Sequence, residues 1–489
     1  RRRAPRAFDA DRHGRLRDPL RCAPGGWPAD AGQHRRADRP HHRAAVAHRD
    51  VHRGTAAGEG DVPAEGRGPE LRPDLPRVGR MNAAGVVVSA EQRRRARNVG
   101  IAYLVLAAVT MLIFTRRTGD ATFKVSETGS FALPAERFGW LLGVLLVALA
   151  AVQLMRGLGR ASNVVLALAT AAFFMSFLSW AASGESFSFV GMLQDTVSRS
   201  VPITLGALGG ILSERSGVIN ISIEGMLLGA ACTSAIAGSL VNLWVGTAVG
   251  IGTGVALAAV LAVLSIRYRV DQVIVGFAIN FFALGITSFV SFRVLVPNPD
   301  FNGLSPVMPI RIPLLADVPF LGEILFVQTV FVYASFVAVA LLTWALYRTR
   351  WGLRTRAIGE YPKAAGTLGV DVLRLRYRNL LLAGGVAGFG GAWWPIGTVG
   401  RFDQNITGGR GFIALAAVIF GRWHPVGAFC GALVFALAEA VRLKIGNFDT
   451  GIPSEFLLMA PYVVTLVVVA GFIGASRAPK AAGQPYEEQ

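Results

Sequence analysis

A few polar side chains lie within or beside long apolar segments of this 489-residue sequence. Asn220 and Glu224 lie in the stretch RSGVINISIEGM, and Gln272 and Asn280 lie in the apolar run that follows Asp271. A polar group is costly in hydrocarbon, so such residues usually face a protein interior or a water-filled cavity. A spacing of four would place Asn220 and Glu224 on one face if this stretch is helical. These residues could line a path for a polar solute, or they could cap and pin a broken helix.

Familiar motifs of catalysis and metal binding do not occur in the sequence. The chain has only four Lys residues, and none lies in a GxxxxGK[ST] phosphate loop, which excludes ATP hydrolysis by that route. No HExxH occurs, and six of the seven His lie in the first 80 residues, which argues against a His-based metal site. The three Cys form no CxxC pair. We therefore expect a chain that is not an enzyme and that carries no metal or cofactor of its own.

The elements that would position these residues are long apolar runs, which recur from residue 99 onward. The sequence is 52% hydrophobic and 16% charged, whereas soluble domains are about 25% charged. A helix needs roughly 20 apolar residues to cross a bilayer core. The expected spans are 99–115, 138–155, 162–182, 198–213, 222–241, 243–266, 272–292, 324–347, 379–399, 411–441 and 455–474. Because Gly421–Pro425 interrupts one run, the sequence predicts an all-α polytopic membrane protein with ten to twelve transmembrane helices.

Charge is concentrated in particular connections between these runs. The 49 Lys and Arg and 31 Asp and Glu give a net charge of +18, which on a soluble protein would suggest nucleic acid. Here the basic residues fall on alternate connections through the eighth span, and the connection 348–378 alone has eight basic and two acidic residues. This is the positive-inside pattern, which predicts a cytoplasmic N-terminus and a lipid bilayer, not nucleic acid, as the partner.

Small residues recur one helical turn apart in three of the expected spans. Close backbone approach promotes helix association in lipid, where apolar helices gain nothing from the hydrophobic effect. The pattern predicts tight helix contacts at Gly206/Gly210, Gly246/Gly250/Gly254 and Gly384/Gly388.

The first 80 residues differ from the rest in composition. They contain 18 Arg, 11 Asp and Glu and no long apolar run, so they cannot bury enough apolar surface to offset their ordering entropy. We expect either a disordered basic tail over 1–80 or upstream sequence translated in error, with Met81 as the true start.

The connection 350–376 combines small residues with basic flanks. Pro362 suits the first turn of a short helix, which Gly366 and Gly369 would end. A solvated basic loop is the simplest interpretation of this pattern, and docking to another protein is the alternative.

Four segments in order resemble known transport proteins. The stretch WGLRTRAIGEYPKAAGTLGVDVLRLR (351–376) resembles the cytoplasmic coupling loop of ABC importer permeases, which docks on the ATPase subunit. The stretches SERSGVINISIEGMLLGA (213–230), DQVIVGFAINFFALGITSF (271–289) and TGGRGFIALAAVIFGRWHPVGA (407–428) resemble the permeases of nucleoside and simple-sugar importers, grouped with ribose-type and branched-chain amino acid permeases. The resemblance runs from about residue 195 to 475.

This resemblance implies the ABC importer permease fold and assigns roles to particular residues. Residues 81–190 would form an N-terminal transmembrane region of about three spans, 191–475 the permease core, and 476–489 a short C-terminal tail. The three early spans exceed the single one expected in shorter family members. The implied ATPase-docking residues are Glu360, Ala364, Ala365, Gly366 and Gly369. The implied translocation-path candidates are Asn220, Glu224, Gln272 and Asn280.

The implied function is that of the membrane-spanning permease of an ATP-driven importer for nucleosides or related simple sugars in a bacterial cytoplasmic membrane. Its partners would be an ABC ATPase, which binds ATP and magnesium, a second permease subunit and an extracytoplasmic lipoprotein receptor for the solute. The alternatives are a permease for another small polar solute, of the branched-chain amino acid or ribose type, and a secondary transporter.

Overall fold

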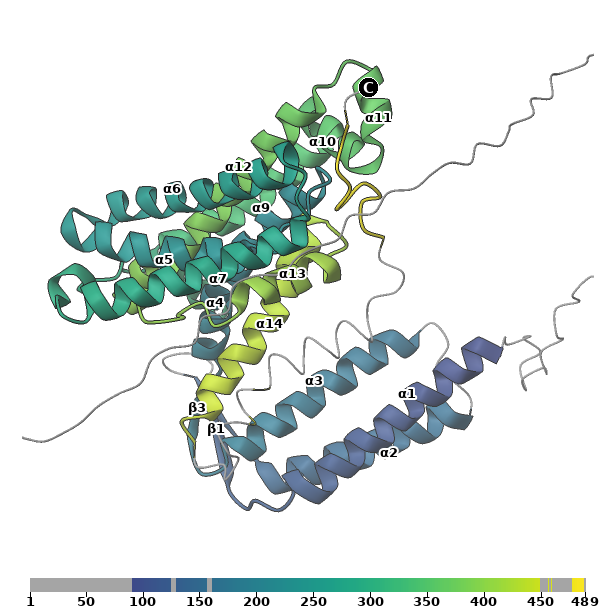
Figure 1. The fold of residues 1–489 in the computed structure, drawn as a ribbon. Coiled ribbons are helices and arrows are strands. Elements are labelled where there is room, and N and C mark those ends of the chain that lie inside the picture. Colours follow the sequence, from purple (N-terminus) through teal and green to yellow (C-terminus); the bar gives the residue numbers. More distant parts are fainter. Residues whose placement is uncertain are drawn as a thin grey trace, which may run out of the picture. The chain divides into compact units, whose positions relative to one another are not determined.

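The computed structural model describes residues 90–124, 129–155, 161–448, 456, 459 and 477–487. Within these ranges the chain is mostly helical, and Figure 1 shows the helices from α1 to α14. The predictions for residues 1–80 lie outside the described residues, as does nearly all of the expected span 455–474.

The helices follow the predicted apolar runs closely. Those that match a run are α1 (Ala90–Val109), α2 (Ala135–Met155), α3 (Ser162–Ala181), α4 (Phe189–Glu214), α5 (Ile223–Leu240), α6 (Leu243–Ala262), α7 (Gln272–Val290), α9 (Val330–Arg348), α12 (Val372–Ala392), α13 (Arg410–Phe420) and α14 (Pro425–Ile445). Short π-helical segments continue four of them: η1 (Thr110–Phe114), η3 (Val263–Arg267), η4 (Ser291–Leu295) and η6 (Trp393–Val399). The remaining short helices are η5 (Pro299–Asn302), α8 (Leu321–Phe326), α10 (Arg350–Glu360) and α11 (Pro362–Thr367).

Nine helices of the described chain are long and apolar enough to cross a membrane. They are α1–α3, α5–α7, α9, α12 and α14, with their π-helical extensions. α4 has 26 residues but carries Asp195 and Arg199 inside the helix, and α13 has only 11 residues. The fold of a polytopic helical membrane protein is therefore confirmed, with α4 and α13 as additional apolar helices.

Two small sheets lie in the connections, which the all-α prediction did not include. β1 (Asp120–Lys124) pairs antiparallel with β2 (Ser130–Pro134) and parallel with β3 (Ser186–Ser188). β4 (Ile310–Arg311) pairs antiparallel with β5 (Val327–Gln328). Each strand has five residues or fewer, so hydropathy over a span-length window does not detect it.

The most deeply buried spans are α5 and α12. In each, 72% of the span is buried, against 28–33% in α1, α2 and α3. α6 crosses α12 through glycine, as the spacing predicts: a Cβ on Gly254 would overlap the carbonyl oxygen of Gly384, and one on Gly388 would lie 2.5 Å from the carbonyl oxygen of Gly250. These glycines allow the two backbones to touch.

A break separates α4 from α5. α4 ends at Glu214 and α5 begins at Ile223, and residues 215–222 form turns between them. Asn220 therefore lies outside the helix that carries Glu224, and the shared helical face that their spacing suggested does not form.

Candidate functional site

Glu224 is the centre of a hydrogen-bonded contact between α5 and the segment before α13. Its Oε1 accepts from the hydroxyl of Thr407 at 2.6 Å and from the N–H of Gly409 at 2.8 Å. Its Oε2 accepts from the N–H of Gly411 at 2.6 Å. The residue is only 7% exposed. The carboxylate thus binds free N–H groups at the N-terminus of α13, where the helix dipole also favours negative charge.

Two glycines make this contact possible. Gly409, whose N–H donates to the carboxylate, has φ +82°, a left-handed conformation that favours glycine. A Cβ on Gly411 would lie 2.5 Å from the Cα of Glu224, so only glycine allows the two segments to approach this closely. The TGGRG sequence at 407–411 is therefore shaped around the Glu224 carboxylate.

The other path candidates bind the break between α4 and α5. Asn280, on α7, accepts at Oδ1 from the N–H of Gly225 at 2.8 Å and donates from Nδ2 to the carbonyl of Ile221 at 2.9 Å. Gln272 accepts from the N–H of Ile219 at 2.7 Å. Together they satisfy backbone groups that the break leaves without helical partners.

Asn220 lies within the break and is fully buried. Its Oδ1 accepts from the Ser222 hydroxyl at 2.8 Å. The structure thus brings the candidates Asn220, Glu224, Gln272 and Asn280 together around one break, with hydrogen-bond partners in the protein. Their contact with a transported solute stays a prediction.

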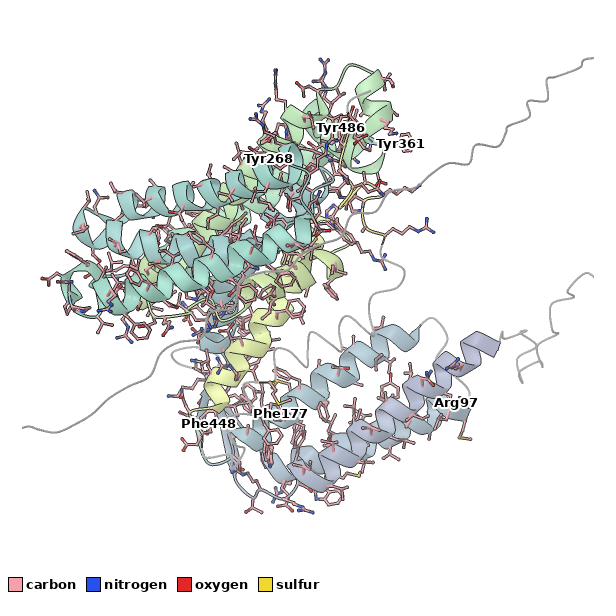
Figure 2. The ribbon with its side chains drawn as sticks, viewed as in Figure 1. Arg97, Phe177, Tyr268, Tyr361, Phe448 and Tyr486 are labelled. Carbon is pink, nitrogen blue, oxygen red and sulfur yellow. The ribbon has the colours of Figure 1, made fainter. Side chains whose placement is uncertain are left out.

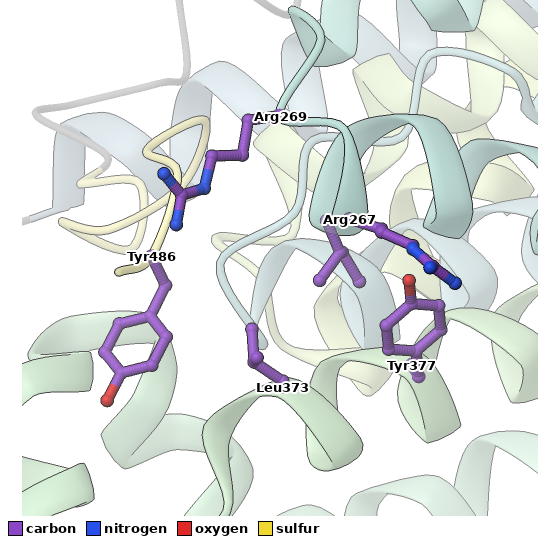
Figure 3. Close-up of a pocket in the computed structure, with 6 residues that line it drawn as sticks. Arg267, Arg269, Leu373, Tyr377 and Tyr486 are labelled. Atoms are coloured by element: carbon purple, nitrogen blue, oxygen red, sulfur yellow. The ribbon is translucent and has the colours of Figure 1, made fainter. Parts of the chain in front are cut away.

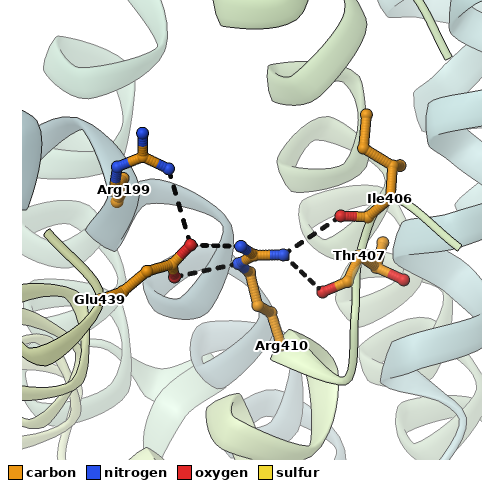
Figure 4. Close-up of polar contacts among 5 residues, drawn as sticks. All are labelled: Arg199, Ile406, Thr407, Arg410 and Glu439. Atoms are coloured by element: carbon orange, nitrogen blue, oxygen red, sulfur yellow. Dashed lines mark hydrogen bonds and ion pairs between the residues drawn. The ribbon is translucent and has the colours of Figure 1, made fainter. Parts of the chain in front are cut away.

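A buried ion pair lies on the other side of the α13 N-terminus. The guanidinium of Arg410 binds both carboxylate oxygens of Glu439 on α14, with Nε 3.1 Å from Oε2, and Arg199 on α4 lies 3.5 Å from Oε1 (Figure 4). Arg410 also donates to the carbonyls of Ile406 and Thr407 at 3.1 and 2.9 Å. Sequence reasoning missed Arg199 and Arg410. The signal was a charge inside an apolar run for Arg199 and directly beside one for Arg410, where a charge requires a partner.

The expected docking element is a pair of short helices. α10 is capped by the Thr349 hydroxyl, and α11 begins at Pro362, as its sequence predicts. Glu360, Ala364 and Gly369 are exposed, and Gly369 has φ +78° in the turn after α11. The two small exposed residues, Ala364 and Gly369, would let another protein approach the backbone closely.

Ala365 and Gly366 face the interior, away from the exposed side of α10 and α11. Ala365 is 4% exposed and packs with Ile358 and Val372, and Tyr486 covers this cluster. A Cβ on Gly366 would lie 2.6 Å from the hydroxyl oxygen of Tyr486. Of the five docking candidates, these two therefore pack against the body of the protein.

The docking element also touches the break directly. Gly359, near the end of α10, packs against the backbone of Arg215 so closely that a Cβ there would overlap the Arg215 carbonyl. Arg215 Nε donates in turn to the carbonyl of Trp423, in the turn between α13 and α14, at 3.1 Å. The hairpin formed by α10 and α11 and the break between α4 and α5 are thus in van der Waals contact.

Residues 192–473 match the family described as branched-chain amino acid transport system / permease component. This match spans more than half of the chain and contains both the break and the hairpin. The chain belongs to this permease family.

Named relatives match a large part of the permease. It is 37% identical to the guanosine ABC transporter permease protein NupQ of Bacillus subtilis over 306 residues, which are 60% of this chain and 94% of the relative. It is 36% identical to the nucleoside ABC transporter permease protein NupC of Lactococcus lactis over 59% of this chain and 93% of the relative. A putative glucose ABC transporter permease protein, TsgC13 of Haloferax volcanii, is 36% identical over 52% and 77%. No solved structure matches the permease.

The family match begins at residue 192, within α4. α1, α2 and α3 therefore lie before the matched residues, and their excess over shorter family members stays a prediction. In the described part of the permease, no group of three or more His, Cys, Asp or Glu is placed to hold a metal ion.

Proposed function

We propose that this permease imports nucleosides across a bacterial cytoplasmic membrane, driven by ATP that a separate ATPase subunit binds with magnesium and hydrolyses. The observation that carries the proposal is the similarity to the NupQ and NupC permeases over more than nine tenths of their lengths. The polar break and the exposed hairpin both lie inside the matched region.

The ATPase would dock on the exposed side of α10 and α11. Glu360, Ala364 and Gly369 are exposed there, beside the hydrophobic side chains of Tyr361 and Leu368, which are 66% and 84% exposed. Exposed apolar side chains with small neighbours favour a protein partner. The basic connection 348–378 supports the proposal that this surface and the N-terminus face the cytoplasm, by the positive-inside rule.

The permease itself would form no covalent bond with the solute. ATP binding to the docked subunit would bias an equilibrium between outward- and inward-facing states. A second permease subunit would complete the path, and an extracytoplasmic lipoprotein receptor would deliver the solute. Residues around the break at 215–222 are then the candidates to line that path.

A simple sugar is the second candidate solute, because the glucose permease relative is as similar as NupC over the part that it covers. The test is uptake of radiolabelled guanosine by proteoliposomes that contain the permease with its ATPase, second permease and receptor. We expect uptake that requires ATP inside and that unlabelled nucleosides inhibit.

Three outcomes contradict the nucleoside proposal. One is uptake driven by an ion gradient without ATP, which would indicate a secondary transporter. The others are ATP-dependent uptake of labelled glucose or leucine with no guanosine uptake, which would indicate a sugar or an amino acid permease.

A further inference from the structure

The C-terminal segment Arg477–Glu487 lies against the end of the molecule that carries the docking hairpin (Figure 1). Figure 2 labels Tyr486 at the same end of the helices as Tyr361, which lies between α10 and α11, and Tyr268, in the α6–α7 connection. No role in transport follows from the function proposed above for this segment. Its contacts, however, join three connections that are distant in sequence.

The first set of contacts joins the segment to the docking hairpin. The N–H of Ala481 donates to the carbonyl of Gly359 at 2.9 Å, and Ala481 is 2% exposed. The ring of Tyr486 packs over the small apolar cluster of α10, α11 and α12 that contains Ile358 and Ala365. The segment therefore supplies the aromatic side chain that covers the inner side of the hairpin.

The second set joins the segment to the break between α4 and α5. A Cβ on Gly483 would lie 2.9 Å from Cδ1 of Ile219, so the backbone at Gly483 packs directly against the Ile219 side chain. Ile219 is the residue whose N–H binds Gln272. The segment thus touches the break at the point where a path candidate holds it.

Arg376 ties the two sets together. Its side chain is 2% exposed, and it donates from Nε to the carbonyl of Ser216 at 3.0 Å and from Nη1 to the carbonyl of Gln484 at 3.2 Å. Its guanidinium carbon lies 6.0 Å from the centre of the Tyr486 ring. A buried guanidinium requires such acceptors, because burying an unpaired charge is costly. One α12 side chain therefore binds both the break and the C-terminal segment.

The segment also reaches the α6–α7 connection. Glu487 pairs with Arg269 at 2.7 Å, although both side chains are largely exposed. Tyr486 forms one wall of a pocket of about 410 Å³ whose other walls include Arg267, Leu373 and Tyr377 (Figure 3). The ion pair is solvated and contributes little to stability. The Tyr486 ring and the backbone contacts therefore hold the segment in place.

We propose that Arg477–Glu487 is a strut that holds the α10–α11 hairpin and the α4–α5 break as one rigid unit. This inference rests on the proposed function, since the motion that it transmits is that of an ATPase docked on the hairpin. Tyr486 and Arg376 are positioning residues in this unit, because they act through the hairpin and the break that they contact. Movement of the hairpin reaches Ser216 and Ile219, and through them the hydrogen bonds of Gln272 and Asn280.

The test uses the complete transporter with Tyr486→Ala and with the chain ended after residue 476. We expect both variants to reach the membrane and to bind the ATPase with near-normal basal ATP hydrolysis. Guanosine uptake should fall at least fivefold, so that more ATP is hydrolysed per solute moved. Tyr486→Phe keeps the ring and Glu487→Gln removes only the solvated ion pair, so both should resemble the wild type.

A distance measurement tests rigidity without reference to the solute. Spin labels would be placed in a cysteine-free background at two exposed positions, Ala364 on α11 and Arg422. Arg422 reports on the break because its neighbour Trp423 accepts a hydrogen bond from Arg215, the first residue of the break. We expect one narrow distance with and without ATP in the wild type, and a broader distribution with Tyr486→Ala.

The strut proposal is overturned by a wild-type distance that changes with nucleotide. It is also overturned by a Tyr486→Ala distance distribution as narrow as that of the wild type. Normal coupling in the truncated chain would do the same. If guanosine uptake is absent in the wild type as well, the proposed function fails, while the distance measurement still decides the strut.

Discussion

Replacement of Glu224 by Gln separates its two possible roles. The carboxylate accepts three hydrogen bonds, from Thr407, Gly409 and Gly411. An amide keeps the size of the side chain but can accept at one oxygen only. If its NH₂ faces Gly411, one buried N–H loses its acceptor. If its NH₂ faces Gly409, that N–H loses its acceptor, although the Thr407 hydroxyl can rotate to accept.

The magnitude follows from the number of hydrogen bonds lost. A hydrogen bond to a charged group contributes roughly 1.5–3 kcal/mol. Glu224→Gln should therefore destabilise the fold by about 2 kcal/mol, and Glu224→Ala, which loses all three, by more. In domains of 150–250 residues, 1 kcal/mol lowers Tm by about 2–4 °C, and the shift is smaller in a longer chain because its entropy of unfolding is larger. We expect a fall in Tm of about 2–4 °C for Glu224→Gln, measured in detergent by loss of monodisperse protein on heating.

The matched control is Glu185→Gln, because Glu185 is exposed in the turn before β3. Its Tm should match that of the wild type. A Glu224→Gln variant with unchanged Tm but an altered KM for solute uptake would refute the capping role and place the carboxylate in the solute path. Lower Tm with normal uptake per folded molecule supports the cap.

Three further substitutions probe other contacts. Gly254→Ala should destabilise the α6–α12 contact by about 1–3 kcal/mol through overpacking, whereas Gly252→Ala, whose Cβ would meet no atom within 4 Å, should leave Tm nearly unchanged. Arg410→Met removes the bidentate partner of Glu439 and leaves Arg199, 3.5 Å away, as its remaining partner, so it should cost less than the about 3–5 kcal/mol of a fully unpaired buried charge; Glu439→Gln added to it should restore part of the lost Tm, and no restoration would argue against a poorly compensated charge. Burial and the charge of Arg215 lower the pKa of His424 below 6.5, so the unfolded chain takes up a proton first as the pH falls. This share of stability is present above pH 6.5 and is lost below it, so the wild type should lose more Tm than His424→Gln between pH 6.5 and 5; parallel curves would contradict the pKa shift.

The helices could be predicted well because span length and hydropathy are local properties. Two helix starts were predicted less well, because α1 begins at Ala90 and α4 at Phe189, each nine residues before its predicted run. In α4, Asp195 and the nearby Arg199 obscure the start of the helix in the sequence. They are accommodated because Asp195 pairs with Lys444 and Arg199 with Glu439, both on α14. Partners that lie more than 200 residues away cannot be identified from a hydropathy window.

The candidate site, like the helices, was predicted where local properties decide and not where distant partners do. The sequence identified Glu224 as a costly polar residue in an apolar stretch, but its role as a cap depends on Gly409 and Gly411, which approach it only in the folded chain. It grouped Ala364 with Ala365, whereas one is exposed and the other is covered by Tyr486. Residue type predicts that a group needs a partner, and only the fold supplies it.

The glycine contact between α6 and α12 has a mechanical consequence. Where the backbones of Gly254 and Gly384 touch, no side chains lie between them that could change rotamer and let one helix slide past the other. α6 and α12 therefore move as one rigid body. α13 is attached differently, because its N-terminus is held by hydrogen bonds and an ion pair that can be exchanged one at a time. We expect the hinges of this transporter to lie at polar contacts like those of α13, whereas the glycine-packed pair of α6 and α12 does not bend.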